Sequence, residues 1–409
     1  MGLDGWLLVL SGLGVAVVLG SKAMEHLPLT GPLVALAAGV ALGPYGADVV
    51  QLPSTQPLLK DVSEVVVAIA LMGVALRYPF AEVAELRRPL TWLLTVGMVG
   101  MAAAVAVIAS IVFDIGWRDA VLLGAVLAAT DPVLSFSMVT GEAAEKAIPS
   151  RLRRLLSIES GANDGLAFPL VLLGIMLVRA HPLERLATDV GVGLVVAVVL
   201  GIAIGVAGGR VLRYLDEHRD IEDSAFFVFT LVLALLTLSV VNLAGGEGVL
   251  AVFIAGLAYN RVVGENIYEQ EREVEEGVNR VLVLPVFLLL GAILPWADWA
   301  QLGAPVILFT AAVLLLRRLP IIAALARPLR FGPPEVAFYG WFGPIGVAAL
   351  FWVTTATEHG ARDGVLWPAV TLAVAASTVA HGITGTPGRA LYARAAGAGA
   401  GDRGAGNRA

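Results

Sequence analysis

The sequence predicts an all-α polytopic membrane protein with about 13 transmembrane helices, two of which are broken near their middle. Three observations predict this class. Of the 409 residues, 58% are hydrophobic and only 15% are charged, whereas a soluble domain has about 25% charged residues. Apolar runs long enough to cross a bilayer follow one another along the whole chain. Some of these runs contain acids and prolines, and an ionisable group at that depth is a functional candidate by default.

Hydropathy divides the chain into thirteen spans. Their approximate limits are 5–21, 29–45, 62–78, 90–113, 119–139, 155–179, 188–213, 224–244, 247–262, 279–295, 302–325, 335–357 and 365–385. The first span is expected to be retained, because residues 1–5 lack the basic segment of a cleavable signal peptide. The transmembrane domain is therefore expected over residues 1–386. Residues 387–409 are rich in Gly, Ala and Arg and are expected to form a short disordered cytoplasmic tail.

The basic residues predict the orientation of these spans. With the N-terminus outside, twenty of the 27 Lys and Arg lie in the cytoplasmic loops or tail and five lie in the outer loops. Cytoplasmic loops carry the excess of positive charge, so the bias predicts a multi-pass protein of the cell membrane with its N-terminus outside and its C-terminus inside. The chain has no cysteine, which excludes disulfide and thiolate chemistry.

Two spans are interrupted halfway. In the fifth, Pro132 follows Asp131, removes a backbone hydrogen bond and pushes Asp131 out of the helical region. In the twelfth, the segment 340–346 contains three glycines and a proline. The two breaks lie seven spans apart, as expected if spans two to seven and eight to thirteen form two repeats. Discontinuous helices at matching places in two halves indicate a transporter site, although two ordinary proline kinks are the alternative.

The sixth span carries the densest polar cluster. On a helix Glu159 lies above Asn163, and Ser160 lies above Asp164, since each pair is four residues apart. A carboxylate away from water is costly as a bare anion, and either a proton or a bound cation discharges it. Hard monovalent cations need oxygen ligands, which Asp164, Ser160 and the Thr130 carbonyl offer. The cluster therefore predicts a site at which a cation and a proton compete.

The polar segments resemble a known family. The segments that carry the resemblance are Ala129-Thr130-Asp131-Pro132-Val133, Ile158-Glu159-Ser160-Gly161-Ala162-Asn163-Asp164-Gly165, Phe342-Gly343-Pro344-Ile345-Gly346-Val347 and His381-Gly382-Ile383-Thr384-Gly385-Thr386-Pro387. They are similar to the monovalent cation/proton antiporters of the "ND" branch, bacterial, archaeal and fungal. The resemblance implies the sodium/proton antiporter fold, an inverted repeat with two crossing broken helices. It also implies a homodimer with core helices over 119–179 and 302–385, and a scaffold with the dimer contact elsewhere.

The resemblance also implies roles for individual residues. Asp164 matches the aspartate that binds cation or proton, and Asn163 matches the amide that replaces a second aspartate in electrogenic relatives. Glu159, Ser160, Asp131 and the Thr130 backbone match the surrounding ligands. The arginine that pairs with the glutamate matches Arg317 best, and Arg318 is the other candidate.

Some of these residues have a second interpretation. Glu159 either contacts the ion directly or forms a buried structural ion pair. Asp131 either contacts the ion or offsets the partial charges of two half-helix ends, which is the favoured interpretation. Ser160 either ligates the ion or bonds to a carbonyl of its own helix. Asn163 is favoured as a support for Asp164.

The function expected from these features is exchange of Na+ (or Li+ or K+) for H+ by alternating access, electroneutral with one ion for one proton. The alternatives are a K+/H+ antiporter of the same fold and a cation channel, which needs a continuous pore. An intramembrane aspartyl protease is disfavoured because the Gly-x-Gly-Asp signature is missing. ATP-driven pumping is disfavoured because no Gly-x-x-x-x-Gly-Lys-Ser/Thr loop occurs. No enzymatic activity, cofactor or nucleic-acid partner is expected. The expected partners are the cation, the proton, membrane lipid and a second copy of the chain.

Overall fold

The computed structural model describes residues 30–49, 55–179, 183–218, 223–264, 282–361 and 364–405, with a few positions between 9 and 19. Most of the first expected span and the start of the tenth, 279–281, lie outside these residues. The described residues form helices and short connections and contain no strand. The all-α prediction is therefore confirmed.

The helices follow the order of the expected spans. Those of the first half are α3 (Gly31–Leu42), α4 (Thr55–Leu76), α5 (Phe80–Glu85), α6 (Arg87–Trp92), the π-helical turn η1 (Leu93–Gly97), α7 (Met98–Phe113), α8 (Trp117–Val126), α9 (Pro132–Val139), α10 (Glu142–Ala147) and α11 (Ser150–Val178). Those of the second half are α12 (Leu183–His218), α13 (Asp223–Leu243), α14 (Gly248–Val263), α16 (Leu284–Ala292), α17 (Trp296–Leu302), α18 (Ala304–Leu316), α19 (Leu319–Ala324), α20 (Ala326–Leu329), α21 (Pro333–Trp341), α22 (Val347–Glu358) and α23 (Leu366–Ala405). Proline occupies one of the first two positions of α16, α18, α19 and α21, where its missing N–H costs no helical hydrogen bond.

Both expected breaks are present. The fifth span consists of α8 and α9, separated by residues 127–131, and α9 begins at Pro132. The twelfth span consists of α21 and α22, separated by residues 342–346. Each break replaces about one turn of helix by extended or irregular backbone. Such backbone is tolerated at membrane depth only where it is buried in protein or lines a water-filled cavity.

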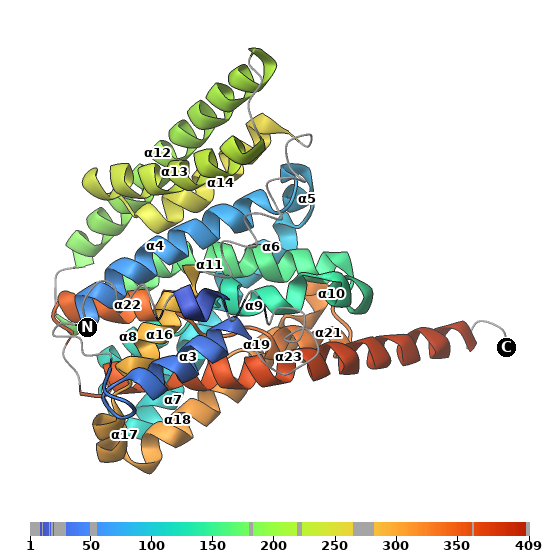
Figure 1. The fold of residues 1–409 in the computed structure, drawn as a ribbon. Helices are drawn as coiled ribbons and strands as arrows, with labels where there is room; N and C mark the ends of the chain where they lie inside the picture. The colour runs from blue at the N-terminus through green and yellow to red at the C-terminus, as the bar shows by residue number, and fades with distance from the viewer. Residues whose placement is uncertain are drawn as a thin grey trace.

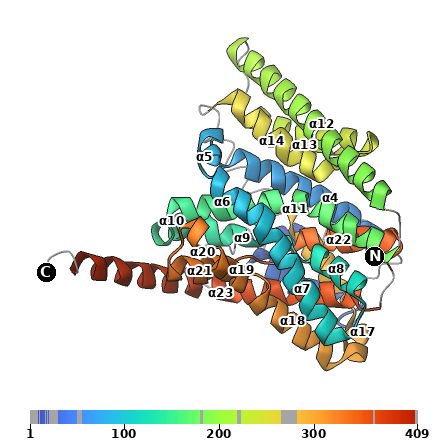
Figure 2. The ribbon, with the colours of Figure 1, turned by 180° about the vertical axis from the view of Figure 1, so that it is seen from behind.

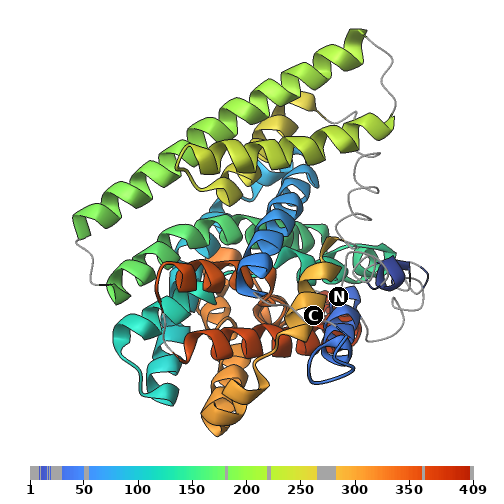
Figure 3. The ribbon, with the colours of Figure 1, turned by 60° about the vertical axis from the view of Figure 1, so that its left-hand side comes forward.

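The helices form two groups (Figure 1). Helices α12, α13 and α14 pack on one another in a layer, and α4 lies against α13 and α14. The remaining long helices form a bundle in which α11 contacts α8 and α9, and α23 contacts α18, α21 and α22. Figure 3 shows the α12–α14 layer on one side of this bundle. Helix α4 also contacts α11 and α22, so it connects the layer to the bundle.

Helix length and composition agree with a multi-pass membrane protein. Among the described residues, five helices are long and apolar enough to cross a membrane, or six if α16 and α17, which meet at 61°, form one span. Large apolar side chains on their outer faces are exposed, including Ile111, Val195 and Leu308, as lipid-facing positions require. These lengths do not fix the number of spans, so thirteen stays a prediction.

Helix α23 continues beyond the boundary expected at residue 386 and reaches Ala405. The first turns beyond the boundary are fixed by packing, because Tyr392 is 4% exposed and its ring lies 5.1 Å from that of Phe338. The Tyr392 hydroxyl also donates to Glu335 at 3.3 Å. The following residues are alanine-rich, and alanine has the highest helix propensity.

Candidate ion-binding site

The two broken spans cross at their breaks. The backbone N–H of Asp131, in the first break, donates to the Pro344 carbonyl in the second at 2.9 Å. Helices α9 and α22 both begin at this crossing, and α8 and α21 both end there. Four helix ends, with their unpaired backbone groups and partial charges, therefore meet inside the protein.

Asp131 lies between the two helix beginnings. Its Oδ1 accepts the backbone N–H of Leu134 at 3.0 Å, in the first turn of α9. Its Oδ2 accepts the backbone N–H of Val347 at 2.5 Å, the first residue of α22. Both carboxylate oxygens are thus used by helix N-termini, whose partial charge is positive. Of the two interpretations of Asp131, this geometry corresponds to the offsetting of half-helix ends.

Arg317 lies between the two helix C-termini, which carry partial negative charge. Its guanidinium donates to the carbonyls of Leu127 at 2.7 Å and Ala129 at 2.9 Å, just beyond α8, and to the carbonyl of Gly343, just beyond α21. Its side chain is 3% exposed. The positive guanidinium meets the negative ends of two half-helices, as Asp131 meets the positive ends. Of the two arginines that the resemblance offers as partners of Glu159, Arg317 is therefore occupied elsewhere.

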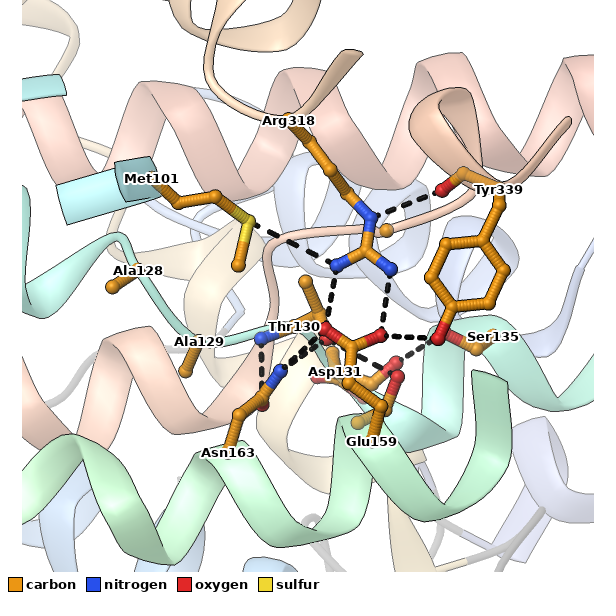
Figure 4. Close-up of polar contacts among 12 residues, drawn as sticks. Met101, Ala128, Ala129, Thr130, Asp131, Ser135, Glu159, Asn163, Arg318 and Tyr339 are labelled. Carbon is orange, nitrogen blue, oxygen red and sulfur yellow. Dashed lines mark hydrogen bonds and ion pairs between the residues drawn. The ribbon is translucent and has the colours of Figure 1, made fainter. Parts of the chain in front are cut away.

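The partner of Glu159 is Arg318. Two parallel bonds join them, from Nη1 to Oε1 at 2.8 Å and from Nη2 to Oε2 at 2.6 Å (Figure 4). Both side chains are buried, with 2% and 0% exposure. A bidentate pair is the strongest form of this interaction, and neither partner remains free for an ion. Neighbouring residues of a helix point about 100° apart, so a difference of one position decides which arginine faces α11.

Tyr339 completes the environment of Glu159, and the sequence reasoning did not include it. Its hydroxyl donates to Glu159 Oε2 at 2.9 Å, and its ring centroid lies 4.8 Å from the Arg318 guanidinium carbon. Its carbonyl accepts from Arg318 Nε at 3.0 Å. A tyrosine directly before the twelfth-span break is the signal that could have found it, because a buried hydroxyl in an apolar span needs a partner.

Tyr339→Phe is expected to lower the free energy of unfolding by about 1.5–3 kcal/mol, the range for a hydrogen bond to a charged group. Thermal unfolding of the purified protein in detergent measures this loss. Tyr214→Phe is the matched control, because Tyr214 is 61% exposed and should melt like the unsubstituted protein. Equal melting temperatures for the two variants would contradict the contact with Glu159.

Two glycines of the second break make room for these charged groups. A Cβ atom on Gly343 would overlap the side chain of Arg318, and one on Gly346 would overlap the carboxylate of Asp131. Neither glycine has a positive φ, so close approach is the reason for glycine at both positions.

Asn163 fastens the first break to α11. Its Oδ1 accepts the backbone N–H of Thr130 at 3.0 Å, and its Nδ2 donates to Thr130 Oγ1 at 2.7 Å and to Glu159 Oε1 at 3.3 Å. The Thr130 hydroxyl in turn donates to Ser160 Oγ at 3.2 Å. Asn163 thus holds Thr130, and the Thr130 hydroxyl bonds Ser160, so two of the expected ligands lie together.

Asp164 differs from the other two acids. Its side chain is 1% exposed, and its Oδ1 atom is buried without a hydrogen bond to any described residue. A buried carboxylate oxygen without a partner is costly and is discharged by a proton or a cation. The Asp164 carbonyl accepts the indole N–H of Trp352, on α22, at 3.3 Å. Asp164 therefore lies beside the crossing with bonding capacity that Glu159 and Asp131 do not have.

Comparison with known proteins gives consistent matches. Residues 13–388 match the family model described as "Sodium/hydrogen exchanger, transmembrane". The chain is 28% identical over 398 residues to Na(+)/H(+) antiporter 2 of Zygosaccharomyces rouxii, a match that covers 88% of this chain and 49% of the relative. It is 25% identical over 351 residues to the K(+)/H(+) antiporter NhaP2 of Shewanella sp. (strain MR-4), covering 85% and 60%. The chain thus spans about half the length of its fungal relative.

The fold has also been seen before. An electron-microscopy structure of the sodium proton antiporter MjNhaP1 from Methanocaldococcus jannaschii superposes with a TM-score of 0.72 and covers 97% of both chains. The sequence identity of 20% makes this a likeness of fold. The inverted repeat with crossing broken helices, expected from the resemblance, is confirmed at the level of the fold.

Proposed function

The chain belongs to the sodium/hydrogen exchanger family, and from this premise we propose that it exchanges a monovalent cation for a proton across a membrane by alternating access. Sodium is the proposed cation, with lithium and potassium as alternatives. The names of the relatives support this choice, since both Na(+)/H(+) and K(+)/H(+) antiporters are among them.

One observation carries the proposal. Of the three acids near the crossing, Asp164 alone has a buried carboxylate oxygen without a hydrogen bond to a described residue. Glu159 is occupied by Arg318 and Tyr339, and Asp131 by two helix N-termini. A carboxylate in that state accepts either a proton or a cation, and the competition between the two is what exchange requires.

The ligands proposed for the cation are Asp164, Ser160 and the Thr130 carbonyl, completed by water. Oxygen ligands of this kind suit hard cations. The hydrogen bond between Thr130 and Ser160 supports the choice, because Ser160 lies one turn before Asp164 on α11 and the bond holds Thr130 against Ser160. Glu159 and Asp131 are proposed as structural charges, since each is bound by groups of the protein.

The burial of the site favours alternating access over a channel. Asp164 is 1% exposed and Ser160 and Thr130 are fully buried, whereas a conducting pore needs a continuous path lined by polar groups. The bundle with α8–α11 and α18–α23 is proposed as the moving core, over 119–179 and 302–385. The remaining helices are proposed as the scaffold that holds the dimer contact.

We further propose that the protein is a homodimer of the cell membrane with its N-terminus outside and its C-terminus in the cytoplasm. It is proposed to work without a cofactor and without catalysing a chemical reaction. The charge bias of the loops supports the orientation.

The test of the exchange activity is dequenching of an acridine dye in proteoliposomes with an acidic interior. Chloride salts of sodium, lithium and potassium are added in turn, and dequenching reports proton efflux driven by the cation. Dequenching by at least one salt, absent from protein-free liposomes, is expected. A flat signal with all three salts would overturn the proposed function.

Exchange is expected to be electroneutral. The apparent affinity of the protein for the cation is expected to weaken as pH falls. One carboxylate that holds either one proton or one cation moves no net charge, so a membrane potential, worth about 2.3 kcal/mol per charge per 100 mV, should not drive the cycle. As pH falls, protons compete more strongly with the cation for the Asp164 carboxylate, so half-saturation needs more sodium. Sodium titrations at several pH values, with valinomycin and potassium clamping the potential, measure both effects. A rate that follows the clamped potential, or an affinity independent of pH, would contradict occupancy of one shared carboxylate.

A further inference from the structure

Four exposed arginines lie on or next to two short helices that contact each other. Arg87 and Arg88 are the first two residues of α6. Arg327 lies in α20, and Arg330 directly follows this helix. Helices α6 and α20 are in contact although about 240 residues separate them in the sequence. Figure 2 shows both on the same side of the bundle. We call these four residues the arginine patch.

The arginine patch differs from the other arginines at this end of the bundle. Arg151 donates to the Leu329 carbonyl at 2.9 Å, Arg153 lies 3.4 Å from a Glu145 carboxylate oxygen, and Arg154 lies 2.7 Å from one of Glu82. No carboxylate among the described residues forms an ion pair with any member of the patch. Clustered charges of one sign repel one another, so a bound anion lowers the electrostatic energy of the patch. The excess of Lys and Arg in cytoplasmic loops explains why positive charge occurs on this side of the protein. It does not explain why two segments far apart in the sequence bring arginines without ion-pair partners to neighbouring helices.

An exposed apolar strip runs into the membrane from each half of the patch. On α6, η1 and α7 it consists of Trp92, Val96 and Val99, with exposures of 44%, 49% and 54%. On α18 and α19 it consists of Leu315 and Leu319, with exposures of 53% and 39%.

The two strips belong to adjacent helices. A Cβ on Gly100 would contact the Ile321 side chain at 3.2 Å, and α7 packs on α18. Trp92, one turn from Arg88, has the chemistry of the membrane interface, where an amphipathic indole ring lies at headgroup level.

We propose that the arginine patch and its two apolar strips bind an anionic phospholipid. The phosphate of the headgroup lies among the four guanidinium groups, which match phosphate geometry, and the acyl chains lie along the strips. Basic sites between transmembrane helices bind anionic headgroups in this way. In the orientation proposed above, the lipid belongs to the cytoplasmic leaflet.

The lipid contacts the segment that holds the buried charges. Leu315 and Leu319 flank Arg317 and Arg318, which occupy the junction of α18 and α19. A lipid that packs on the outer face of this junction stabilises the same backbone from which Arg318 reaches Glu159. The bound lipid therefore stabilises the folded bundle, an effect independent of transport.

The test is thermal unfolding of the purified full chain in dodecyl-maltoside micelles containing phosphatidylglycerol or phosphatidylcholine. Phosphatidylglycerol is expected to raise the melting temperature above the value in phosphatidylcholine. R87Q/R88Q and R327Q/R330Q are each expected to raise the half-saturating phosphatidylglycerol concentration about 25-fold, since each arginine near an anionic surface contributes roughly fivefold. R87K/R88K keeps the charge and should retain most of the response. R210Q/R213Q, near the C-terminal end of α12, is the control and should respond like the unsubstituted protein.

Three results would overturn the proposal. The first is equal stabilisation of the unsubstituted protein by phosphatidylcholine and phosphatidylglycerol, which is measured without any variant. Inorganic phosphate alone could reproduce the stabilisation, which would indicate a free-anion site. The response to phosphatidylglycerol could also be equal in the patch variants and the R210Q/R213Q control. Melting in phosphatidylcholine alone shows that each variant is folded before its response is compared.

Discussion

Replacement of Asp164 by asparagine is expected to reduce cation-driven proton efflux to the level of protein-free liposomes. An amide neither takes up and releases a proton near neutral pH nor offers a negative charge to a cation, so it removes both halves of the exchange. Among the acids at the crossing, Asp164 has the carboxylate oxygen without a hydrogen bond to a described residue. The substitution leaves no charged partner behind.

The folded protein should tolerate this change. Asparagine has nearly the same shape as aspartate, and removal of a buried charge without an ion-pair partner relieves a desolvation cost. The melting temperature of Asp164→Asn is therefore expected to equal or exceed that of the unsubstituted protein. Asp114→Asn is the control, because the same chemical change falls on an exposed residue at the end of α7 and should leave both activity and melting unchanged. Full activity of a folded Asp164→Asn protein would refute the assignment of Asp164 as the exchanging group.

Replacement of Arg318 by alanine is expected to destabilise the protein by about 3–5 kcal/mol, the range for breaking a buried ion pair. The loss is large because the buried Glu159 carboxylate, with 0% side-chain exposure, loses the opposite charge that it pairs with. Thermal unfolding in detergent measures the loss. Arg210→Ala is the control, because Arg210 is exposed on α12 and its removal leaves no buried charge.

A double-mutant cycle distinguishes the two neighbouring arginines. Glu159→Ala and Arg318→Ala should be strongly non-additive, since the second substitution removes a charge that the first has already left unpaired. Arg317→Ala also costs stability, because four carbonyls lose their donor, but its coupling to Glu159→Ala should be much smaller. Stronger coupling of Glu159 to Arg317 than to Arg318 would show that the observed pairing does not hold in solution.

The position of both helix breaks could be predicted because their causes are local. Proline removes a backbone donor wherever it stands, and Pro132 lies inside an apolar run. The same holds for the Gly-Pro segment between Trp341 and Val347. Neither prediction required knowledge of what the break touches. The polar face of α11 was equally predictable, because positions four apart share a face on any helix.

The partners of these groups could not be predicted in the same way. The sequence pattern favours Arg317 over Arg318 and does not point to Tyr339, because one position along α18–α19 rotates a side chain by about 100° and nothing local fixes that rotation. Packing against α11 and α21 fixes it, and it directs Arg318 to Glu159 and Arg317 to the helix ends. The extension of α23 past residue 386 has a similar cause, since the contact of Tyr392 with α21 is long-range.

The sequence alone determined the class of the protein, the two breaks and the set of polar residues that gather near the crossing. Hydropathy, proline and helical spacing act within a few residues, so they can be read along one dimension. The tertiary structure decided which of these residues neutralise one another and which one is left. Asp131 and Glu159 are occupied by groups from α22, α18–α19 and α21, and Asp164 keeps a buried oxygen without such a group. That distinction depends on distances between segments more than 150 residues apart, which no local pattern specifies.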